Sequence, residues 1–508
     1  MRGASRVSEE IATLRVAAMI ALTLALAGGA QGAAQRSVPA VTVVRCPIAA
    51  PDGSRMECLR LRVPENRVHP TGKELSLLVL RFRSTAAHPA ADPVLWLAGG
   101  PGGSAVALTT RPTLHRADVA PLLARRDVIV LEQRGTLYSR PALTCPARES
   151  DEACLARLTR EGNDLRAYTS AASADDIEAL RQVLHISRWN VLGESYGTRV
   201  AQTLIRRHPG HLRSVVLDSV VSIADDTVAD SSAEAAGAFE RLFSACAADP
   251  GCNTAYGGLE ATLRRAYDTL ERRPLQVRGR AFGASYAFEL DGPQLVRWVY
   301  TGMYETALIP LLPRAITAAS QGQSDPVWHA IASNLEVGIS LLLARGVHRA
   351  VNCNEEVPFT NLSRIAATDA ANPGVAPFFS GRRLFELCKT LPARHPNPVE
   401  NRAVASSVPT LLLTGQLDPV TPPSEGGRVA RHLSHSFFYE FPGLGHWVNP
   451  VHACPRRIML AFLDRPTQRP DASCVADMRP PAWAKETAHR RPETPTAGRQ
   501  GATMLGND

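Results

Sequence analysis

The sequence has no cluster of basic residues, although it is basic overall. Its formal net charge is +8 at pH 7, yet arginines occur as scattered pairs such as Arg125-Arg126 and Arg206-Arg207. A surface that binds phosphate usually shows clustered positive charge. We therefore expect no nucleic-acid partner.

Long apolar runs are also missing after the first 34 residues, so we expect no stable membrane span in the mature chain. The run at residues 16–27 (VAAMIALTLALA) is about 12 residues long, whereas a spanning helix needs about 20. Arg2, Arg6 and Arg15 precede this run, and small residues follow it. The pattern is typical of a secretory signal peptide, which we predict at residues 1–34, and it indicates a secreted or periplasmic protein.

The sequence contains no CxxC pair and no His/Cys cluster at metal-ligand spacing, so no metal site is predicted. Its ten cysteines are an even number, as expected for disulfides in an oxidising compartment. Proximity along the chain predicts the pairs Cys46–Cys58, Cys145–Cys154, Cys246–Cys252, Cys353–Cys388 and Cys454–Cys474.

Internal repeats are absent, and short runs rich in Val and Leu alternate instead with helical patterns. This alternation predicts an α/β fold, with a mostly parallel sheet covered by helices on both faces. The predicted helices of this part lie at residues 174–184 and 199–207. The predicted strands lie within residues 75–82, 93–100, 127–135, 189–195, 212–220, 408–415 and 436–443.

The alternation stops near residue 222 and resumes near residue 405. Mainly helical patterns fill the gap, and an insertion of this size predicts a second domain. These patterns lie at residues 233–247, 259–272 and 293–301. We therefore divide the mature chain into a first core part (35–222), a helical cap (223–404), a second core part (405–478) and a flexible tail (479–508) that is poor in apolar residues.

The segment WNVLGESYGT (residues 189–198) places a Gly-x-Ser-x-Gly motif between a predicted strand and a predicted helix. In such a sharp turn the serine adopts a strained backbone conformation, and the flanking glycines avoid collisions. Ser195 is therefore the predicted nucleophile. The amide of Tyr196, at the start of the helix, is a predicted donor to a developing oxyanion.

A second oxyanion donor is expected in the loop after an earlier strand, where residues 97–104 read LAGGPGGS. Glycines in this loop would let the backbone come close to the substrate carbonyl. We predict the amide of Gly100 as the donor, with Gly99 as the alternative.

The acid and the base should follow the nucleophile, at the ends of later strands. Asp418 lies just after the strand predicted at residues 408–415, in a loop stiffened by prolines, and is the predicted acid. Asp218, at the end of the strand predicted at residues 212–220, is the alternative acid.

His446 is the predicted general base, because it lies on a glycine-flanked loop after the last predicted strand. His432 and His435 precede that strand, and His452 lies beyond the loop. Attack by Ser195 on a carbonyl would then give an acyl-enzyme that water hydrolyses, as in other serine hydrolases. This chemistry requires no cofactor, and none is predicted.

Several segments resemble the proline iminopeptidase and tripeptidyl aminopeptidase family of α/β-hydrolases, especially exported members with a C-terminal domain like that of tripeptidyl aminopeptidases (TAP-like). These segments are GGPGGS, DVIVLEQRGTLYSRPALTC, NVLGESYGT, LLLTGQLDPVTPP and GLGHWV. The resemblance extends from about residue 40 to about residue 475 and is thin in the predicted cap. It implies an α/β-hydrolase fold and a secreted serine aminopeptidase that releases residues or short peptides from peptide substrates with a free N-terminus.

Members of the family that this sequence resembles bind the substrate ammonium group through carboxylates of the cap. The resemblance implies that role here for Glu355, with Glu356 second, since a disulfide at Cys353 would anchor this turn. A solvated acidic turn is the alternative. Two departures, Ala98 where proline-specific relatives often carry histidine and Glu132 where many carry aspartate, weaken the case for proline specificity.

Two other functions compete with an aminopeptidase. A carboxylesterase or lipase-like hydrolase is the main alternative, because the same triad cleaves esters and the fold does not determine the substrate. An inactive binding protein on this fold would not need the intact triad and both glycine-rich donor segments, which argues against it.

Overall fold

The computed structural model describes residues 39–69, 72–391, 396–479 and 481–484. The predicted signal peptide lies outside these residues. Within the described part of the chain, no helix is long and apolar enough to cross a membrane.

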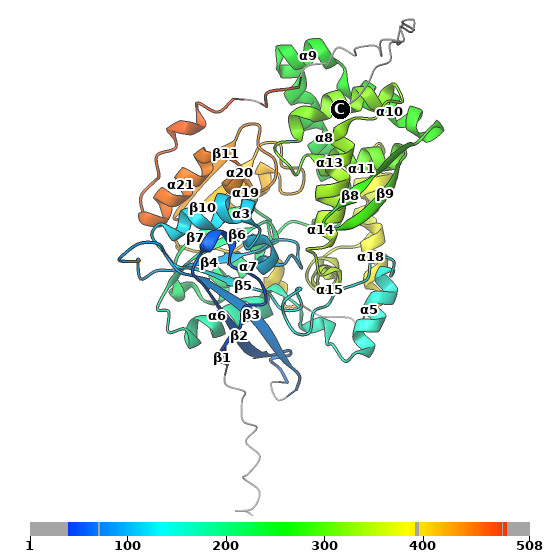
Figure 1. The fold of residues 1–508 in the computed structure, drawn as a ribbon. Coiled ribbons are helices and arrows are strands. Elements are labelled where there is room, and N and C mark those ends of the chain that lie inside the picture. Colours follow the sequence, from blue (N-terminus) through cyan, green and yellow to red (C-terminus); the bar gives the residue numbers. More distant parts are fainter. Residues whose placement is uncertain (1–38, 70–71, 392–395, 480, 485–508) are drawn as a thin grey trace, which may run out of the picture.

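Nine strands form one sheet in the order β1-β2-β3-β5-β4-β6-β7-β10-β11 (Figure 1). The six strands from β5 to β11 in this order are parallel, and β1, β2 and β3 pair antiparallel beside them. The predicted mostly parallel α/β fold is therefore confirmed. The strands are β1 (Ala40–Val44), β2 (Met56–Pro64), β3 (Glu74–Phe82), β4 (Val94–Leu97), β5 (Val128–Leu131), β6 (Trp189–Glu194), β7 (Leu212–Asp218), β10 (Thr410–Gly415) and β11 (Ser436–Phe441).

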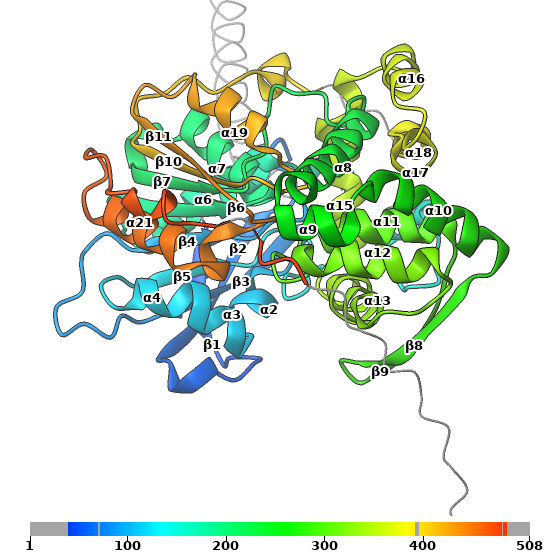
Figure 2. The ribbon, with the colours of Figure 1, turned by 90° about the horizontal axis from the view of Figure 1, so that it is seen from above.

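Helices cover both faces of this sheet, which explains why its central strands read as continuous apolar runs. Every residue of β4, β5, β6 and β10 is buried. Helices α6 (Ser170–Val183) and α7 (Tyr196–Arg207) lie on one face of the sheet, and α21 (Ala453–Asp464) lies on the other (Figure 2). Successive side chains of β3 enter different apolar clusters, because Leu77 belongs to the cluster that includes residues of α6 and α7, and Leu78 to the cluster that includes residues of α21. The other helices of the predicted core parts are α2 (Ala105–Thr109), α3 (Pro112–Leu114), α4 (Ala120–Leu123), α5 (Asp151–Arg160), α19 (Pro423–Ala430) and α20 (Val448–Val451).

Residues 223–404, here called the inserted segment, lie between β7 and β10 and hold helices and one hairpin beside the sheet (Figure 1). Much of this segment surrounds an apolar cluster of its own, which includes Trp298 and Trp328. The hairpin β8 (Leu275–Ala281) to β9 (Ala284–Leu290) is not among the sequence predictions. The helices are α8 (Ser231–Ala248), α9 (Pro250–Tyr256), α10 (Leu259–Arg272), α11 (Gly292–Gly302), α12 (Leu312–Ser320), α13 (Pro326–Ala330), α14 (Gly338–Ser340), α15 (Arg345–Glu355), α16 (Leu362–Ala371), α17 (Ala376–Phe379) and α18 (Arg382–Cys388).

All ten cysteines lie in the described residues and form five disulfides. The predicted pairing is confirmed in full. The bonds are Cys46–Cys58, Cys145–Cys154, Cys246–Cys252, Cys353–Cys388 and Cys454–Cys474.

The described end of the chain corrects part of the predicted flexible tail. The Ala484 amide donates to the Pro310 carbonyl at 3.0 Å, and Trp483 packs against the apolar cluster of the inserted segment. Pro481 lies against Gly443, where an added Cβ would approach the proline ring to 2.9 Å. Residues 481–484 therefore bind across the boundary between the core and the inserted segment. The rest of the predicted tail, residues 485–508, lies outside the described residues.

Candidate active site

The predicted nucleophile occupies a strained turn between β6 and α7. Ser195 has φ 54° and ψ −124°, a backbone conformation that non-glycine residues rarely adopt. A Cβ on Gly193 would lie 2.5 Å from the Gly197 carbonyl oxygen, and one on Gly197 would collide with the Leu97 carbonyl. Both glycines of the motif are thus required by close backbone approach, as expected for a nucleophile elbow.

The predicted base and acid contact each other at the carboxyl ends of neighbouring parallel strands. His446 Nδ1 lies 2.8 Å from Asp418 Oδ2, and the Asp418 carboxylate is fully buried. Burial opposes ionisation of Asp418, but His446 and local hydrogen bonds outweigh it, and the pKa of Asp418 is lowered. Burial also opposes the charge on His446, yet Asp418 raises its pKa above the ordinary value. The pair is therefore arranged to stabilise an imidazolium.

Thr421 is a residue of this site that the sequence predictions missed. Its hydroxyl donates to Asp418 Oδ2 at 2.7 Å, and its amide donates to Asp418 Oδ1 at 3.0 Å. The hydroxyl oxygen also lies 3.3 Å from His446 Nδ1. Thr421 thus fixes the carboxylate plane relative to the imidazole. Its position three residues after the acid, in a proline-stiffened loop, was the available signal.

The alternative acid, Asp218, makes different contacts. Its two carboxylate oxygens accept the amides of Val448 and Asn449, at 3.0 and 2.8 Å. The His446 ring is hydrogen-bonded to Asp418 and not to Asp218. The geometry thus favours Asp418 as the acid partner of His446.

The predicted oxyanion loop lies directly against Ser195. A Cβ on Gly99 would approach the Ser195 Cβ to 2.7 Å and its Oγ to 3.2 Å. Gly100 has φ 127°, which favours glycine at this position. Among the described residues, no hydrogen bond uses the amides of Gly99, Gly100 or Tyr196 as donors. These amides are therefore free to donate to a substrate.

The structure does not join all three triad residues. Ser195 Oγ makes no hydrogen bond to His446, and no other described residue binds it. Catalytic hydrogen bonds are often long in unliganded enzymes and tighten when substrate binds. The serine, the paired acid and base, and the free amides nevertheless all lie at the carboxyl ends of the parallel strands.

Two family models match the chain. Residues 92–256 match the model for the alpha/beta hydrolase fold, and residues 376–474 match the model for TAP-like proteins. The chain is an α/β-hydrolase with a TAP-like C-terminal region. The predicted family is thereby confirmed, although the TAP-like match begins before residue 405, within the inserted segment.

Three relatives show the range of proteins that this α/β-hydrolase resembles. The serine protease Hip1 of Mycobacterium tuberculosis is 24% identical over 450 residues, which cover 77% of this chain and 81% of that protein. The tripeptidyl aminopeptidase of Streptomyces coelicolor is 28% identical over 198 residues, 34% of this chain and 36% of that protein. Carboxylesterase B of Mycobacterium tuberculosis is 25% identical over 418 residues, 74% of this chain and 78% of that protein.

Groups from the sheet core and from the inserted segment hold the oxyanion loop in place. Gln133, two residues after β5, donates to the Ala98 carbonyl at 3.0 Å. On the other side, the Ala344 amide donates to the Gly102 carbonyl at 2.9 Å. His348 Nδ1 lies 3.2 Å from the Pro101 carbonyl, and burial lowers the pKa of His348 to about 4. The neutral ring therefore donates its Nδ1–H to this loop at physiological pH.

The inserted segment also contacts the acid and histidine loops. Arg241 donates to the Asp418 carbonyl at 2.8 Å, and the Tyr300 hydroxyl donates to the Pro419 carbonyl at 3.0 Å. The Tyr304 ring centre lies 5.2 Å from that of His446. Both loops that carry the acid–base pair thus depend on α8, α11 and the turn that follows α11.

The predicted ammonium ligands do not line an open site, and this prediction is corrected. Glu355 is 2% exposed and accepts the Ser170 amide, the Ser170 hydroxyl at 2.7 Å and Arg199 Nε at 3.2 Å. Glu356 lies 2.7 Å from Arg199 Nη1 and accepts the Thr227 hydroxyl at 3.1 Å. Arg199 pairs with both acids and Glu355 is buried, so neither the ammonium role nor the alternative of a solvated turn fits Glu355.

Among the described residues, two groups of side chains are close enough together to hold a metal ion, but each is already engaged. One contains Cys145 and Cys154, which form a disulfide. In the other, Glu178 with His208 and His211, both carboxylate oxygens accept hydrogen bonds from Arg181. Neither group contains a residue of the predicted triad.

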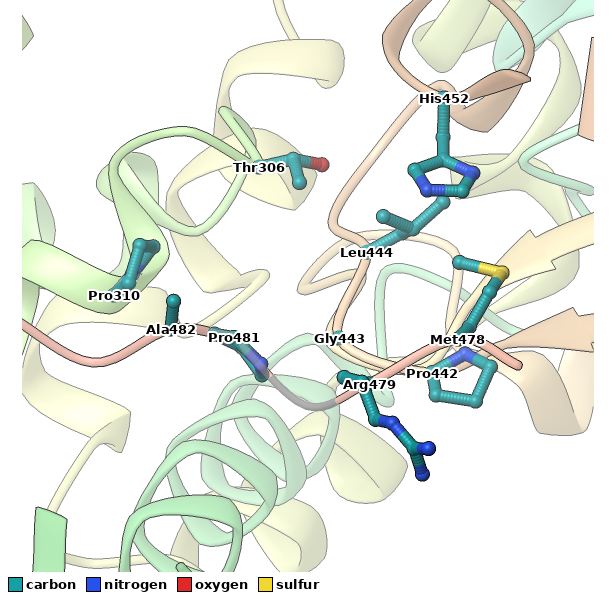
Figure 3. A pocket seen from close by; sticks show the side chains of 10 residues that line it. All are labelled: Thr306, Pro310, Pro442, Gly443, Leu444, His452, Met478, Arg479, Pro481 and Ala482. Carbon is teal, nitrogen blue, oxygen red and sulfur yellow. The ribbon is translucent and has the colours of Figure 1, made fainter. Parts of the chain in front are cut away.

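A cavity of about 210 Å³ lies beside the segment that leads to His446 (Figure 3). Thr306 and Pro310 of the inserted segment, Leu444 before the histidine, and the chain near Pro481 surround it. Its lining includes no triad residue. The cavity therefore marks the joint between the histidine loop, the inserted segment and the end of the chain, and not the place of the reaction.

Proposed function

We propose that this α/β-hydrolase is an exported serine aminopeptidase that releases residues or short peptides from free N-termini. The observation that carries the hydrolytic part is the strained Ser195 elbow at the same sheet edge as the buried pair of His446 and Asp418. The relatives named serine protease and tripeptidyl aminopeptidase support a peptide substrate. Five disulfides and the N-terminal pattern support export.

In the proposed mechanism, His446 removes the proton of Ser195 as its hydroxyl attacks the scissile carbonyl. Asp418 orients the imidazole and stabilises its charged form. The amides of Tyr196 and Gly100 donate to the oxyanion that develops on the carbonyl oxygen. His446 then protonates the leaving amine. In the second half of the reaction it removes a proton from water, which attacks the acyl-enzyme, and it returns the proton to Ser195.

We propose Glu234 as the ammonium ligand in place of Glu355, because it lies about two helical turns before Arg241 on α8, and Arg241 donates to the Asp418 carbonyl at 2.8 Å. Glu234 lies in the first turn of α8, is partly exposed, and forms no ion pair or side-chain hydrogen bond with another described residue. Burial, together with Asp230 and Asp225, raises its pKa to about 8. A substrate ammonium would relieve this repulsion between carboxylates, because an opposite charge favours the ionised form.

The test compares fluorogenic peptide amides with free and acetylated N-termini, alongside short-chain esters. We expect the free peptides to react fastest and Ser195→Ala to abolish all turnover. Glu234→Gln should raise KM for free peptides by roughly tenfold, from loss of a charge-assisted contact. Glu240→Gln, on an exposed part of the same helix, is the matched control. Equal rates on free and acetylated peptides would refute the aminopeptidase assignment.

A carboxylesterase is the second candidate, and a specific observation favours it. The relative named carboxylesterase B aligns with 74% of this chain, a larger share than the tripeptidyl aminopeptidase does. Turnover of esters with no detectable cleavage of any peptide amide would decide for this candidate.

A further inference from the structure

Three buried carboxyl groups next to the catalytic machinery have no part in the proposed mechanism. Asp118, Glu194 and Asp218 are 1%, 4% and 0% exposed. Glu194 immediately precedes the nucleophile, and the backbone carbonyl of Asp218 accepts the Ser195 amide at 2.9 Å. Buried carboxyls are costly unless hydrogen bonds compensate them, so their partners indicate what they hold in place.

The end of β7 binds three consecutive amides that directly follow His446. Ser219 Oγ accepts the Trp447 amide at 2.7 Å, and the Asp218 carboxylate accepts those of Val448 and Asn449 at 3.0 and 2.8 Å. Trp447 has φ 65°, a left-handed conformation that costs energy in a bulky residue. These bonds compensate that cost and hold the turn that the main chain makes directly after His446.

Asn449 extends this arrangement to the second carboxyl. Its backbone amide binds Asp218, and its side-chain amide donates to Asp118. Trp96 Nε1 donates both to Asp118 Oδ2 at 2.7 Å and to Glu194 Oε1 at 3.1 Å. A continuous chain of hydrogen bonds therefore joins the residue before Ser195 to the residues after His446.

The protonation of these carboxyls depends on their burial and on one another. Burial, followed by Asp118 and Asp218, raises the pKa of Glu194 well above its ordinary value. Burial raises the pKa of Asp118, and it raises that of Asp218 to about 7 against the amides of Asn449 and Val448. The charged groups of other elements that face them are Arg456, which favours the Asp118 anion, and His446, which favours the Asp218 anion.

We propose that Asp218 is a positioning residue for His446, which clamps the backbone after the histidine and is braced through Asn449 by Asp118. This inference rests on the proposed serine hydrolase function. Asp418 orients the imidazole through its side chain, whereas Asp218 fixes where the histidine main chain lies. Two aspartates at the ends of neighbouring strands thus divide the placement of one base.

The clamp has a consequence for pH dependence. An ionised Asp218 accepts two amides, but protonation turns one of its oxygens into a donor that faces an amide N–H. The clamp therefore weakens as pH falls through about 7. Protonation of His446 inactivates the base over a nearby pH range, since its pKa is raised by Asp418 and Asp218. The fall of activity toward acid pH should then reflect the uptake of two protons, one by Asp218 and one by His446, and not of one proton alone.

The test is Asp218→Asn in the full chain, with kcat, KM and the pH profile measured on a peptide amide or ester that the wild type hydrolyses. A fluorophosphonate that labels Ser195 counts active sites, so kcat refers to folded enzyme. We expect kcat to fall by roughly 10- to 100-fold at pH 8, as a displaced base would cause. KM should change by less than about twofold. In this variant the fall of activity toward acid pH should reflect the uptake of a single proton by His446. It should also occur at lower pH, because one negative neighbour of His446 is removed.

Asp127→Asn is the matched control, since this carboxylate precedes β5 at the opposite edge of the sheet and binds Arg81 and the Ser84 amide. It should lower stability and leave kcat and the pH limb unchanged. Wild-type kcat and an unaltered limb in Asp218→Asn would overturn the proposal.

If Asp218→Asn does not fold, Asn449→Ala decides the question. This variant keeps its backbone amide on Asp218 and loses only the link to Asp118. A fall in kcat at constant KM supports the clamp, and an unchanged kcat overturns it. A wild type that neither hydrolyses substrate nor reacts with the fluorophosphonate would refute the proposed function instead, so the two failures are distinguishable.

Discussion

Replacement of Glu355 by Gln separates the role expected for this residue from the sequence from the role that its contacts indicate. An ammonium ligand would, when neutralised, raise KM for free peptides and leave stability unchanged. In the structure the carboxylate is buried and holds Arg199 and Ser170. We therefore expect Glu355→Gln to lower the free energy of unfolding, with little change in KM.

The size of the loss follows from these contacts. Breaking one side of a buried ion pair costs about 3 to 5 kcal/mol. Arg199 keeps Glu356 at 2.7 Å, and burial raises the pKa of Glu355 despite Arg199, so its charge is incompletely compensated. Both facts favour the lower value, about 3 kcal/mol, or about 100-fold in the ratio of folded to unfolded protein.

A smaller effect on kcat is also expected. The Ser170 hydroxyl donates to Glu355 at 2.7 Å and lies 2.9 Å from the hydroxyl of Tyr196, the predicted oxyanion residue. Gln retains only one of the two acceptor oxygens, so this hydrogen-bonded chain beside the nucleophile is weakened, and we expect kcat to fall by roughly twofold to tenfold, the effect of about one hydrogen bond.

The assay is urea denaturation followed by tryptophan fluorescence, combined with kinetics on free and acetylated peptides. Glu386→Gln is the control, because Glu386 forms an exposed pair with Lys389, which contributes at most about 1 kcal/mol. A several-fold rise of KM for free peptides alone, at unchanged stability, would show that Glu355 binds the ammonium group and that this reasoning is wrong.

Three further outcomes are expected. In the wild type, kcat/KM should fall as pH drops through the raised pKa of His446, above the ordinary 6.5, because only the neutral ring accepts a proton; a profile that stays flat to pH 5 would contradict this. Asp418→Asn should lower kcat on the order of 1,000-fold or more and move this limb to lower pH, as steady-state kinetics would show. Replacing Cys353 and Cys388 by Ala opens a 35-residue loop and should cost about 3.8 kcal/mol by loop entropy in urea unfolding, and a loss below about 1 kcal/mol would refute the estimate.

Local signals in the sequence were sufficient for the parallel strands and for most of the catalytic residues. A central strand such as β5 is buried on both faces, so it reads as an unbroken apolar run. The glycines around Ser195 reflect collisions within a few residues of the motif. Asp418 and His446 could be predicted because each lies in the loop that follows a strand recognisable in the sequence, β10 and β11.

Other features depend on contacts that no local pattern records. Strand β2 was missed because arginines interrupt its apolar residues, so it gives no continuous run. The acidic pair at Glu355 was conspicuous in the sequence, but its partner Arg199 lies 156 residues earlier, on α7. Because Glu355 is buried and paired with this distant arginine, a residue predicted to bind substrate is instead part of the core.

Contacts between residues far apart in the sequence also change the expected role of the inserted segment. The sequence predicted a helical cap at residues 223–404 without indicating contacts to the catalytic loops, yet Arg241 and Tyr300 donate to main-chain carbonyls of the acid loop, 177 and 119 residues away. Thr306 accepts the Gly445 amide next to His446 at 3.0 Å, a separation of 139 residues. A lid that opens freely would have to break these bonds and would displace the acid and the base each time. Substrate should therefore enter beside the inserted segment rather than through its detachment, since catalysis requires the bonded geometry to persist.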